Sequence, residues 1–342
     1  MNDVKLKDHS IGIMAPAVFP IRKDLMYGGA ELFIYYLCAE LGRRDVKYTL
    51  YAAKNSQAPG GELKETIDAP FAWNTNEEER SYNNVPEEDW FKHILLNDHT
   101  HRGICFEQKQ LHVVKTLHGV STWRHIPRNY PRFISLSQYH REITRDRLGV
   151  DSRVAGLGVD PSDYPFNDKP DDYYVLFGLM APHKGHLQAI EVCKKLGLKL
   201  MVAGEDKFVP DPAHVEKIKA ACDGKDIVYC GSVDAAKKMT LLSNARATIL
   251  PFLFNEAYSI ILFESLLLGT PVITTPVGAI PEMMSNSVGF VEQLTDWERF
   301  PAAIKEINRE QCHKFAVERY DIRVCADKYI KAFEDTIEGV LW

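Results

Sequence analysis

The chain has 342 residues, of which 45% are hydrophobic and 26% are charged, and its formal net charge at neutral pH is −6. This length suggests two domains, and the composition is typical of a globular protein in water. The net negative charge argues against a general nucleic-acid binder, because such proteins carry positive charge for the phosphates.

The cysteines and the N-terminal segment bear on the cellular compartment. The seven cysteines are scattered and include no Cys-x-x-Cys pair, so neither a disulfide framework nor a zinc site is indicated. The first ten residues are polar and lack the apolar core of a signal peptide. No apolar run approaches the roughly 20 residues that a membrane span needs. A cytoplasmic location is therefore expected.

Short apolar runs alternate with helical stretches along the chain, a pattern typical of parallel sheets flanked by helices. The N-terminal part is predicted to contain a helix at 30–41, ended by Gly42, and a polar surface loop at 74–89. Its strands are predicted at 11–15, 48–53, 94–96, 113–117 and 133–136.

A second series of the same kind begins near residue 173. Its strands are predicted at 173–177, 199–203, 227–230, 247–253 and 272–275, and its helices at 187–196, 213–221 and 259–268. The segment 156–172 between the two series is dense in Gly, Pro and Asp and is predicted to be an interdomain linker. The chain is therefore predicted to be an α/β protein with two sheet-containing domains.

Two glutamates lie eight residues apart in the second series. Glu256 follows a predicted strand, and ligands of parallel α/β sheets bind beyond the carboxyl ends of the strands. Glu264 lies in the next helix and can point its carboxylate toward the same crevice. Because carboxylates accept hydrogen bonds from adjacent hydroxyls and a helix N-terminus favours an anion, the pattern suits a ligand with a diol at each end and an anion between. Alternatively, Glu264 only solvates one edge of the helix.

This Glu, seven residues, Glu segment resembles the donor site of retaining glycosyltransferases with the GT-B fold, specifically glycosyltransferase family 4. The resemblance implies two Rossmann-like domains whose parallel sheets face an interdomain cleft. The expected domains are an acceptor-side domain at 1–158, a nucleotide-sugar-binding domain at 159–320, and a C-terminal helix at 321–342 that packs back on the first domain. The resemblance also implies that Glu256 contacts hydroxyls of the transferred sugar and that Glu264 holds the ribose.

The pair Gly28-Gly29 precedes the first predicted helix. Paired glycines there let a ligand approach closely and leave amides for an anion, although such a pair can also be an ordinary loop. The Gly-Gly-x-Glu sequence resembles the family loop that faces the donor phosphates and the acceptor. In that loop Glu31 is expected to be a structural or helix-dipole residue rather than a catalyst.

His118 ends a β-branched run and precedes a glycine, which places it at a strand carboxyl end. It is either a polar residue whose hydrogen bonds are made within the protein, or the histidine that lies beside the transferred sugar in the family. The Thr-x-His-Gly sequence resembles the family at this position. Asp98, His99 and His101 have a spacing that metal ligands also show. Their segment is also similar to a metal-free segment of the family, so no metal is expected.

Lys184 follows the predicted strand at 173–177 and can offer its charge to a diphosphate leaving group. The family usually has an arginine at the start of this loop, where this chain has Leu179. Three explanations remain open: Lys184 and backbone amides suffice, another cation such as Lys207 substitutes, or the donor binds weakly.

Ala257, Tyr258 and Ser259 directly follow the first glutamate and complete the predicted substrate-binding set. The family commonly has glycines at the positions of Ala257 and Ser259, so a tighter sugar pocket is expected.

Six arginines lie between residues 124 and 147, an unusual concentration in an acidic protein. They form either a solvated helix face with a basic loop, or a patch for an anionic acceptor or a membrane surface. These residues are Arg124, Arg128, Arg132, Arg141, Arg145 and Arg147.

The resemblance implies sugar transfer, with retention and without metal or cofactor, from a nucleotide-diphosphate donor to an acceptor hydroxyl. UDP- and GDP-sugars are the expected donors, and the acceptor is a glycan, a lipid or a small molecule. His118, Glu256 and Lys184 are the expected catalytic residues. Two alternatives remain: a degenerate, non-catalytic nucleotide-sugar-binding subunit, which Leu179 favours, and a same-fold epimerase. An oxidoreductase is disfavoured because no Gly-x-Gly-x-x-Gly follows the first strand.

Overall fold

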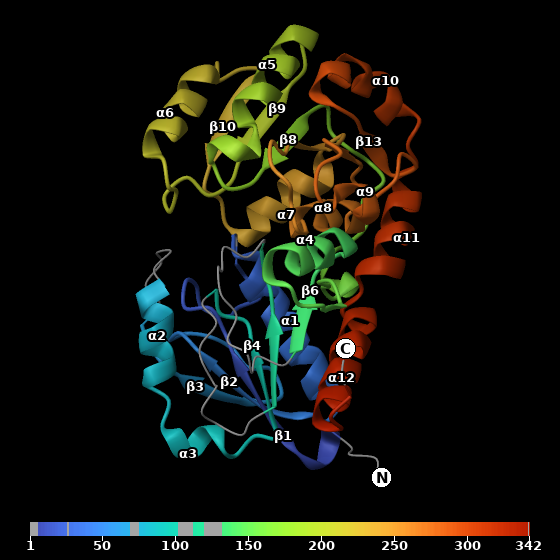
Figure 1. Ribbon diagram of the computed structural model, residues 1–342. Coiled ribbons are helices and arrows are strands. Elements are labelled where there is room, and N and C mark those ends of the chain that lie inside the picture. Colours follow the sequence, from blue (N-terminus) through green and yellow to red (C-terminus); the bar gives the residue numbers. More distant parts are fainter. Residues whose placement is uncertain (1–5, 26, 69–74, 102–111, 120–131, 341) are drawn as a thin grey trace. The chain divides into compact units, whose positions relative to one another are not determined.

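A computed structural model describes residues 6–25, 27–68, 75–101, 112–119, 132–340 and 342. The chain divides into two compact units. Unit 1 comprises Met1–Lys23, Gly28–Val159 and Ile322–Trp342, and unit 2 comprises Asp24–Tyr27 and Asp160–Asp321. Each unit contains one parallel sheet with helices packed against it (Figure 1).

Unit 1 is built on a seven-stranded sheet with the order β3-β2-β1-β4-β5-β6-β7. Every neighbouring pair of strands in it is parallel. The strands are β1 Ser10–Met14, β2 Lys47–Ala52, β3 Glu62–Glu65, β4 Leu95–Asp98, β5 His112–Thr116, β6 Arg132–Ser135 and β7 Arg153–Val154. The helices are η1 Leu6–Asp8, α1 Gly29–Arg43, α2 Thr75–Asn83, α3 Glu87–Trp90, α4 Gln138–Leu148 and α12 Ile322–Ile337. The order of the strands reverses between β1 and β4, which makes this the switch point of the sheet.

The C-terminal helix α12 belongs to unit 1 although it follows unit 2 in the chain. Arg44, just after α1, donates to the Asp327 carboxylate of α12 at 2.5 Å and to the Arg323 carbonyl at 3.0 Å. The Tyr329 ring of α12 lies 5.3 Å from that of Phe33 in α1, and both side chains are fully buried. A buried aromatic contact and an ion pair thus attach the last helix to the first.

Unit 2 is built on a six-stranded parallel sheet with the order β10-β9-β8-β11-β12-β13. The strands are β8 Tyr174–Phe177, β9 Leu200–Ala203, β10 Ile227–Gly231, β11 Thr248–Leu250, β12 Val272–Thr274 and β13 Gly289–Val291. The helices are η2 Pro161–Asp163, η3 Pro182–Lys184, α5 His186–Leu196, α6 Pro212–Ala221, α7 Ala235–Asn244, α8 Ile260–Leu267, α9 Ile280–Met283, η4 Leu294–Arg299, α10 Phe300–Lys305 and α11 Arg309–Tyr320. Here the switch point lies between β8 and β11.

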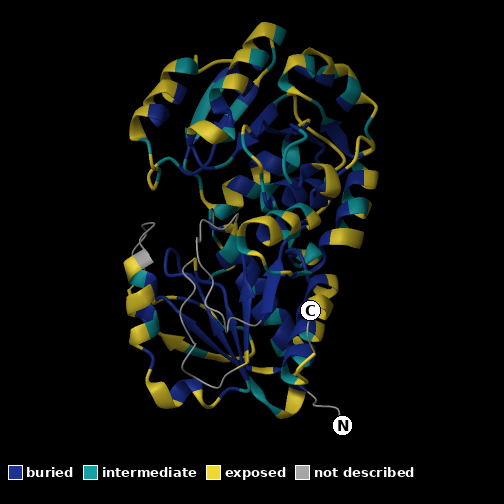
Figure 2. Cartoon of the chain, in the orientation of Figure 1, coloured by how far each residue is buried: buried dark blue, intermediate teal, exposed yellow. Residues whose placement is uncertain are grey.

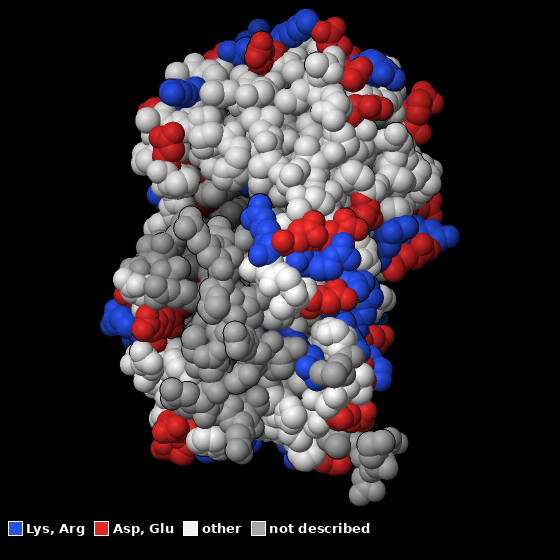
Figure 3. Space-filling view, viewed as in Figure 1, with Lys and Arg blue, Asp and Glu red and all other residues white. Residues whose placement is uncertain are grey.

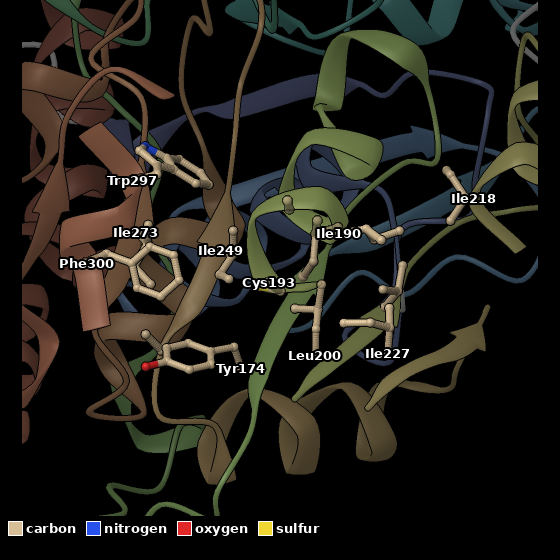
Figure 4. Close-up of a cluster of buried hydrophobic side chains, with 14 of the residues drawn as sticks. Tyr174, Ile190, Cys193, Leu200, Ile218, Ile227, Ile249, Ile273, Trp297 and Phe300 are labelled. Carbon is tan, nitrogen blue, oxygen red and sulfur yellow. The ribbon is translucent and has the colours of Figure 1, made fainter. Parts of the chain in front are cut away.

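Most strands of both sheets are buried, whereas the edge strand β3 and the outer faces of the helices are exposed (Figure 2). In unit 2, Ile190 and Cys193 of α5 pack with Leu200 and Ile227 of the sheet, in one continuous apolar cluster (Figure 4). Burial of this apolar surface stabilises the unit, at roughly 25 cal/mol per Å² removed from water. The packed sheet provides a rigid base for the loops at its carboxyl edge.

Three predictions about local structure are wrong. The stretch predicted as a loop at 74–89 contains α2 and most of α3, because Glu78 and Ser81 are buried and give α2 an inward face that its polar composition conceals. Helix α1 runs to Arg43, through Gly42 rather than ending before it. The strand predicted at 247–253 is shorter, since β11 ends at Leu250 and Pro251 begins a loop.

Candidate functional site

The switch point of unit 2 brings two predicted site residues together. Lys184 lies in the loop after β8, and Glu256 lies in the loop after the adjacent strand β11. The Lys184 Nζ is 2.7 Å from the Glu256 Oε2, and the two side chains are 19% and 15% exposed. Residues 72 positions apart therefore form a half-buried ion pair at the edge of the sheet where α/β proteins bind ligands.

A close backbone approach joins these two loops. Gly185 has a φ of 71°, and a Cβ atom at this position would lie 2.2 Å from the Pro251 carbonyl oxygen. The Leu253 amide donates to the His183 carbonyl at 3.0 Å. The Lys184 ammonium also lies over the Phe254 ring, 4.6 Å from its centroid. Glycine is thus required at 185 to seat the lysine against the loop that carries its partner.

The residues after Glu256 lead into α8. Ala257 and Ser259 are buried, and the Ser259 amide donates to the Met283 sulfur at 3.4 Å. The Tyr258 ring makes edge contacts with two other rings, at 6.1 Å from Phe263 and 6.3 Å from Tyr320. Packing therefore holds this segment against the helix.

Glu264 is buried in α8 and binds two partners that the sequence did not indicate. Its carboxylate accepts a hydrogen bond from the Tyr164 hydroxyl at 2.9 Å. The Lys238 Nζ of α7 lies 2.7 Å from the same carboxylate, and this lysine side chain is 8% exposed. Lys238 also lies 5.7 Å from the ring centroid of Phe177, the last residue of β8. Glu264 is thus one half of a buried ion pair and does not solvate a helix edge.

Lys238 is a candidate site residue that sequence reasoning missed. Helix α7 buries Leu241 and Leu242, three and four residues after Lys238, so this lysine occupies the apolar stripe of the helix. A charged residue at such a position signals a buried partner. Lys207, the substitute cation named from sequence, is exposed, and Leu179 is buried.

In unit 1, the predicted residues lie in the segments that follow β1 and β5. Gly28 is buried, precedes the first residue of α1, and has a φ of 120°, a conformation that other residues rarely adopt. Gly29, the first residue of α1, is exposed. His118 follows β5 by two residues and is half-buried.

His118 belongs to a hydrogen-bonded row of side chains. The His118 Nε2 lies 2.8 Å from the His99 Nδ1, and the His99 Nε2 lies 2.6 Å from the Asn97 Oδ1. The two imidazole rings are stacked, with centroids 5.1 Å apart. Burial lowers the pKa of His99 to about 3, with a smaller contribution from the Lys115 cation. Burial also lowers the pKa of His118 well below its usual range, so both rings are neutral at ordinary pH.

The residues with metal-ligand spacing have protein partners instead. The Asp98 carboxylate forms a buried ion pair with Lys115 at 3.1 Å and accepts the Thr100 amide at 2.8 Å. The His101 Nδ1 lies 2.8 Å from the Glu78 carboxylate. Across residues 6–25, 27–68, 75–101, 112–119 and 132–340, no three His, Cys, Asp or Glu side chains are grouped so as to hold a metal ion.

Glu31 is buried in the first turn of α1, where burial raises its pKa to about 7. The His101 ring lowers this pKa and the Glu78 carboxylate raises it, each by less than burial does. The role predicted for Glu31, a structural or helix-dipole residue, stays a prediction.

The arginine-rich region is divided between the core and exposed ion pairs. Arg132 is buried in β6, and its guanidinium lies 5.2 Å from the Trp342 ring. Arg141 of α4 makes a bidentate contact with Asp151, at 2.7 and 2.6 Å. Figure 3 shows acidic and basic side chains mixed on the visible face. Arg124 and Arg128 lie outside the described residues. No described helix is long and apolar enough to cross a membrane.

Residues 163–322 match the sequence model of the family described as glycosyl transferases group 1. This match covers nearly all of unit 2, including the Lys184–Glu256 and Lys238–Glu264 ion pairs. Among curated proteins, no sequence matches this chain.

Solved structures match over nearly the whole chain. AviGT4, a glycosyltransferase involved in Avilamycin A biosynthesis, is 18% identical with a TM-score of 0.72, over 98% of this chain and 99% of its own. Sucrose-phosphate synthase from Thermosynechococcus elongatus is 13% identical with a TM-score of 0.79, over 97% and 100%. Anabaena HepE, solved with UDP and glucose, is 14% identical with a TM-score of 0.73, over 96% and 100%. The fold is therefore the GT-B fold of these enzymes, with two Rossmann-like parallel-sheet units, and the predicted fold class is confirmed.

Proposed function

We propose that this protein is a retaining glycosyltransferase of family 4 that transfers a sugar from a nucleotide-diphosphate donor to an acceptor hydroxyl without a metal ion. The observation that carries the proposal is the Lys184–Glu256 ion pair at the switch point of a GT-B unit. The match of residues 163–322 to the glycosyl transferases group 1 model supports it.

The two members of the pair have complementary parts in the reaction. As the bond to the sugar breaks, negative charge grows on the departing diphosphate, and a preorganised cation stabilises this charge. Lys184 is the cation for that step. Glu256 accepts hydrogen bonds from hydroxyls of the transferred sugar and, through its contact with Lys184, holds the ammonium at the loop edge before the donor binds.

Glu264 is assigned to the ribose of the nucleotide. A buried carboxylate can accept hydrogen bonds from two adjacent hydroxyls only if its charge is balanced, and Lys238 supplies the balancing charge. In this proposal Gly28 and Gly29 allow close approach of the donor phosphates, and His118 lies beside the sugar. Ala257, Tyr258 and Ser259 shape the sugar pocket.

A degenerate, non-catalytic nucleotide-sugar-binding subunit is the second candidate. Leu179 favours it, because a buried leucine at this position makes no bidentate phosphate contact. The same-fold epimerase has no observation of its own in its favour.

The test is a titration of the protein with UDP-, GDP- and ADP-sugars without added metal. The UDP-sugars come first, because Anabaena HepE was solved with UDP and with UDP-glucose. We expect one nucleotide series to raise the melting temperature and to release free nucleoside diphosphate slowly. Stabilisation without release, even with candidate acceptors, would assign the protein to the non-catalytic class. The absence of any response would contradict the assignment of the donor site.

A further inference from the structure

The row Asn97, His99 and His118 runs along the carboxyl edge of the unit 1 sheet. Asn97 lies in β4 and His99 directly after it, while His118 follows the neighbouring strand β5. Asn97 and His99 are fully buried and His118 is half-buried, so the row leads from the core toward the surface.

The direction of the hydrogen bonds is fixed at the buried end of the row, at Asn97. The Asn97 Nδ2 donates to the Val114 carbonyl at 3.0 Å and to the Thr116 hydroxyl at 3.1 Å. A carbonyl only accepts, which fixes the orientation of the amide and turns its oxygen toward His99. The His99 Nε2, 2.6 Å from that oxygen, must therefore carry a hydrogen.

The ring hydrogen of His99 in turn fixes the direction of the hydrogen bond between His99 and His118. His99 is neutral because it is buried and close to the Lys115 cation, so it has one ring hydrogen, which is on Nε2. Its Nδ1 is then an acceptor, and the His118 Nε2 at 2.8 Å must donate to it. A neutral His118 that carries its hydrogen on Nε2 has an unprotonated Nδ1.

We infer that Asn97 and His99 are positioning residues that hold His118 in its Nε2–H tautomer, so that the His118 Nδ1 accepts a hydrogen bond from a substrate hydroxyl. The ring cannot donate from that atom, so it selects a neutral, hydroxyl-bearing group over a carboxylate or a phosphate. The hydrogen bond from a substrate hydroxyl rests on the proposed function, whereas the tautomer of His118 does not.

The tautomer can be measured on full-length protein labelled with ¹⁵N-histidine, because the ring-nitrogen shifts separate the two neutral tautomers and the cation. A His118→Gln variant identifies the His118 signals among the twelve histidines. We expect a single neutral Nε2–H form for His118. An Nδ1–H form or an imidazolium would overturn the inference, whether or not the protein transfers sugar.

Two substitutions test the role of His99. His99→Asn keeps an acceptor near the position of the ring Nδ1, whereas His99→Leu removes it. In His99→Leu we expect the His118 shifts to move toward a tautomer mixture and kcat/KM to fall about tenfold, the size of one net hydrogen bond. His99→Asn keeps the acceptor but loses the contact with Asn97, so we expect smaller changes in both readouts than in His99→Leu. Unchanged His118 shifts in folded His99→Leu would overturn the role, and if that variant does not fold, the wild-type spectrum decides.

Discussion

The two units hold their candidate residues near the carboxyl ends of their strands by different means. Unit 2 uses pairs of opposite charge, Lys184–Glu256 and Lys238–Glu264. Unit 1 places the neutral rings of His99 and His118 beside each other and keeps its ion pair, Asp98–Lys115, buried. A charged diphosphate needs a cation, whereas sugar and acceptor hydroxyls need oriented neutral partners. In the proposed function, the carboxyl edges of the two sheets thus serve two different chemistries.

The largest expected effect comes from breaking the buried pair of unit 2. Lys238→Met leaves the Glu264 charge uncompensated in the core and should lower the free energy of unfolding by about 3–5 kcal/mol, measured by urea denaturation. Lys237→Met is the matched control, because this neighbouring lysine is exposed and should change the value by less than about 0.5 kcal/mol.

The double variant Lys238→Met with Glu264→Gln removes both charges and keeps an acceptor for Tyr164. At least half of the lost stability should return, since the remaining cost is no longer that of a buried charge. An equally unstable double variant would show that Lys238 acts by packing and not by charge.

The half-buried pair is expected to matter for turnover rather than for folding. Lys184→Gln should lower kcat by about 100-fold, or about 2.7 kcal/mol, the size found when one transition-state donor is removed. Steady-state release of nucleoside diphosphate measures it, and Lys207→Gln is the exposed control. A comparable loss in both variants would show that general surface charge is responsible.

The burial of one histidine, His186, predicts how the free energy of unfolding depends on pH. His186 of α5 is fully buried, and no described group bonds either ring nitrogen. Burial lowers its pKa to about 3, so between pH 6.5 and 3 the unfolded chain binds the proton and the folded chain does not. Its contribution is therefore lost as pH falls, by about 2 kcal/mol at pH 5. His186→Leu should reduce the difference in unfolding free energy between pH 8 and pH 5 by that amount, and an unchanged difference would contradict this.

The smallest effect should come from the surface ion pair of α4. Arg141 and Asp151 are 40% and 44% exposed, so solvent screens their attraction. Arg141→Ala should change the free energy of unfolding by less than about 1 kcal/mol, and even less in high salt. A larger, salt-insensitive loss would mean that this pair helps to hold α4 in place.

The local pattern of the sequence predicted most strands of both sheets, together with helices α1, α5, α6, α8 and α12. The apolar run at 113–117 and the observed β5 differ by one residue, as do the predicted strand at 199–203 and β9. The helices α2, α3, α7, α9, α10 and α11 and the short strands β3, β7 and β13 were missed. Most of these elements are short or polar, so their burial depends on neighbours that are distant in the sequence.

For the candidate site, the sequence by itself determined which loops carry the residues, because strand ends and glycines are local signals. The contacts among these residues were decided only by the tertiary structure. Neither the Lys184–Glu256 pair nor the Lys238–Glu264 pair could be read from spacing, since each joins segments separated by other elements of the sheet. The same holds for the state of His118, because its tautomer depends on Asn97 and His99, which reach it from the neighbouring strand. Sequence patterns report which residues share a face, whereas a charge or a ring proton is set by the groups that folding brings within hydrogen-bonding distance.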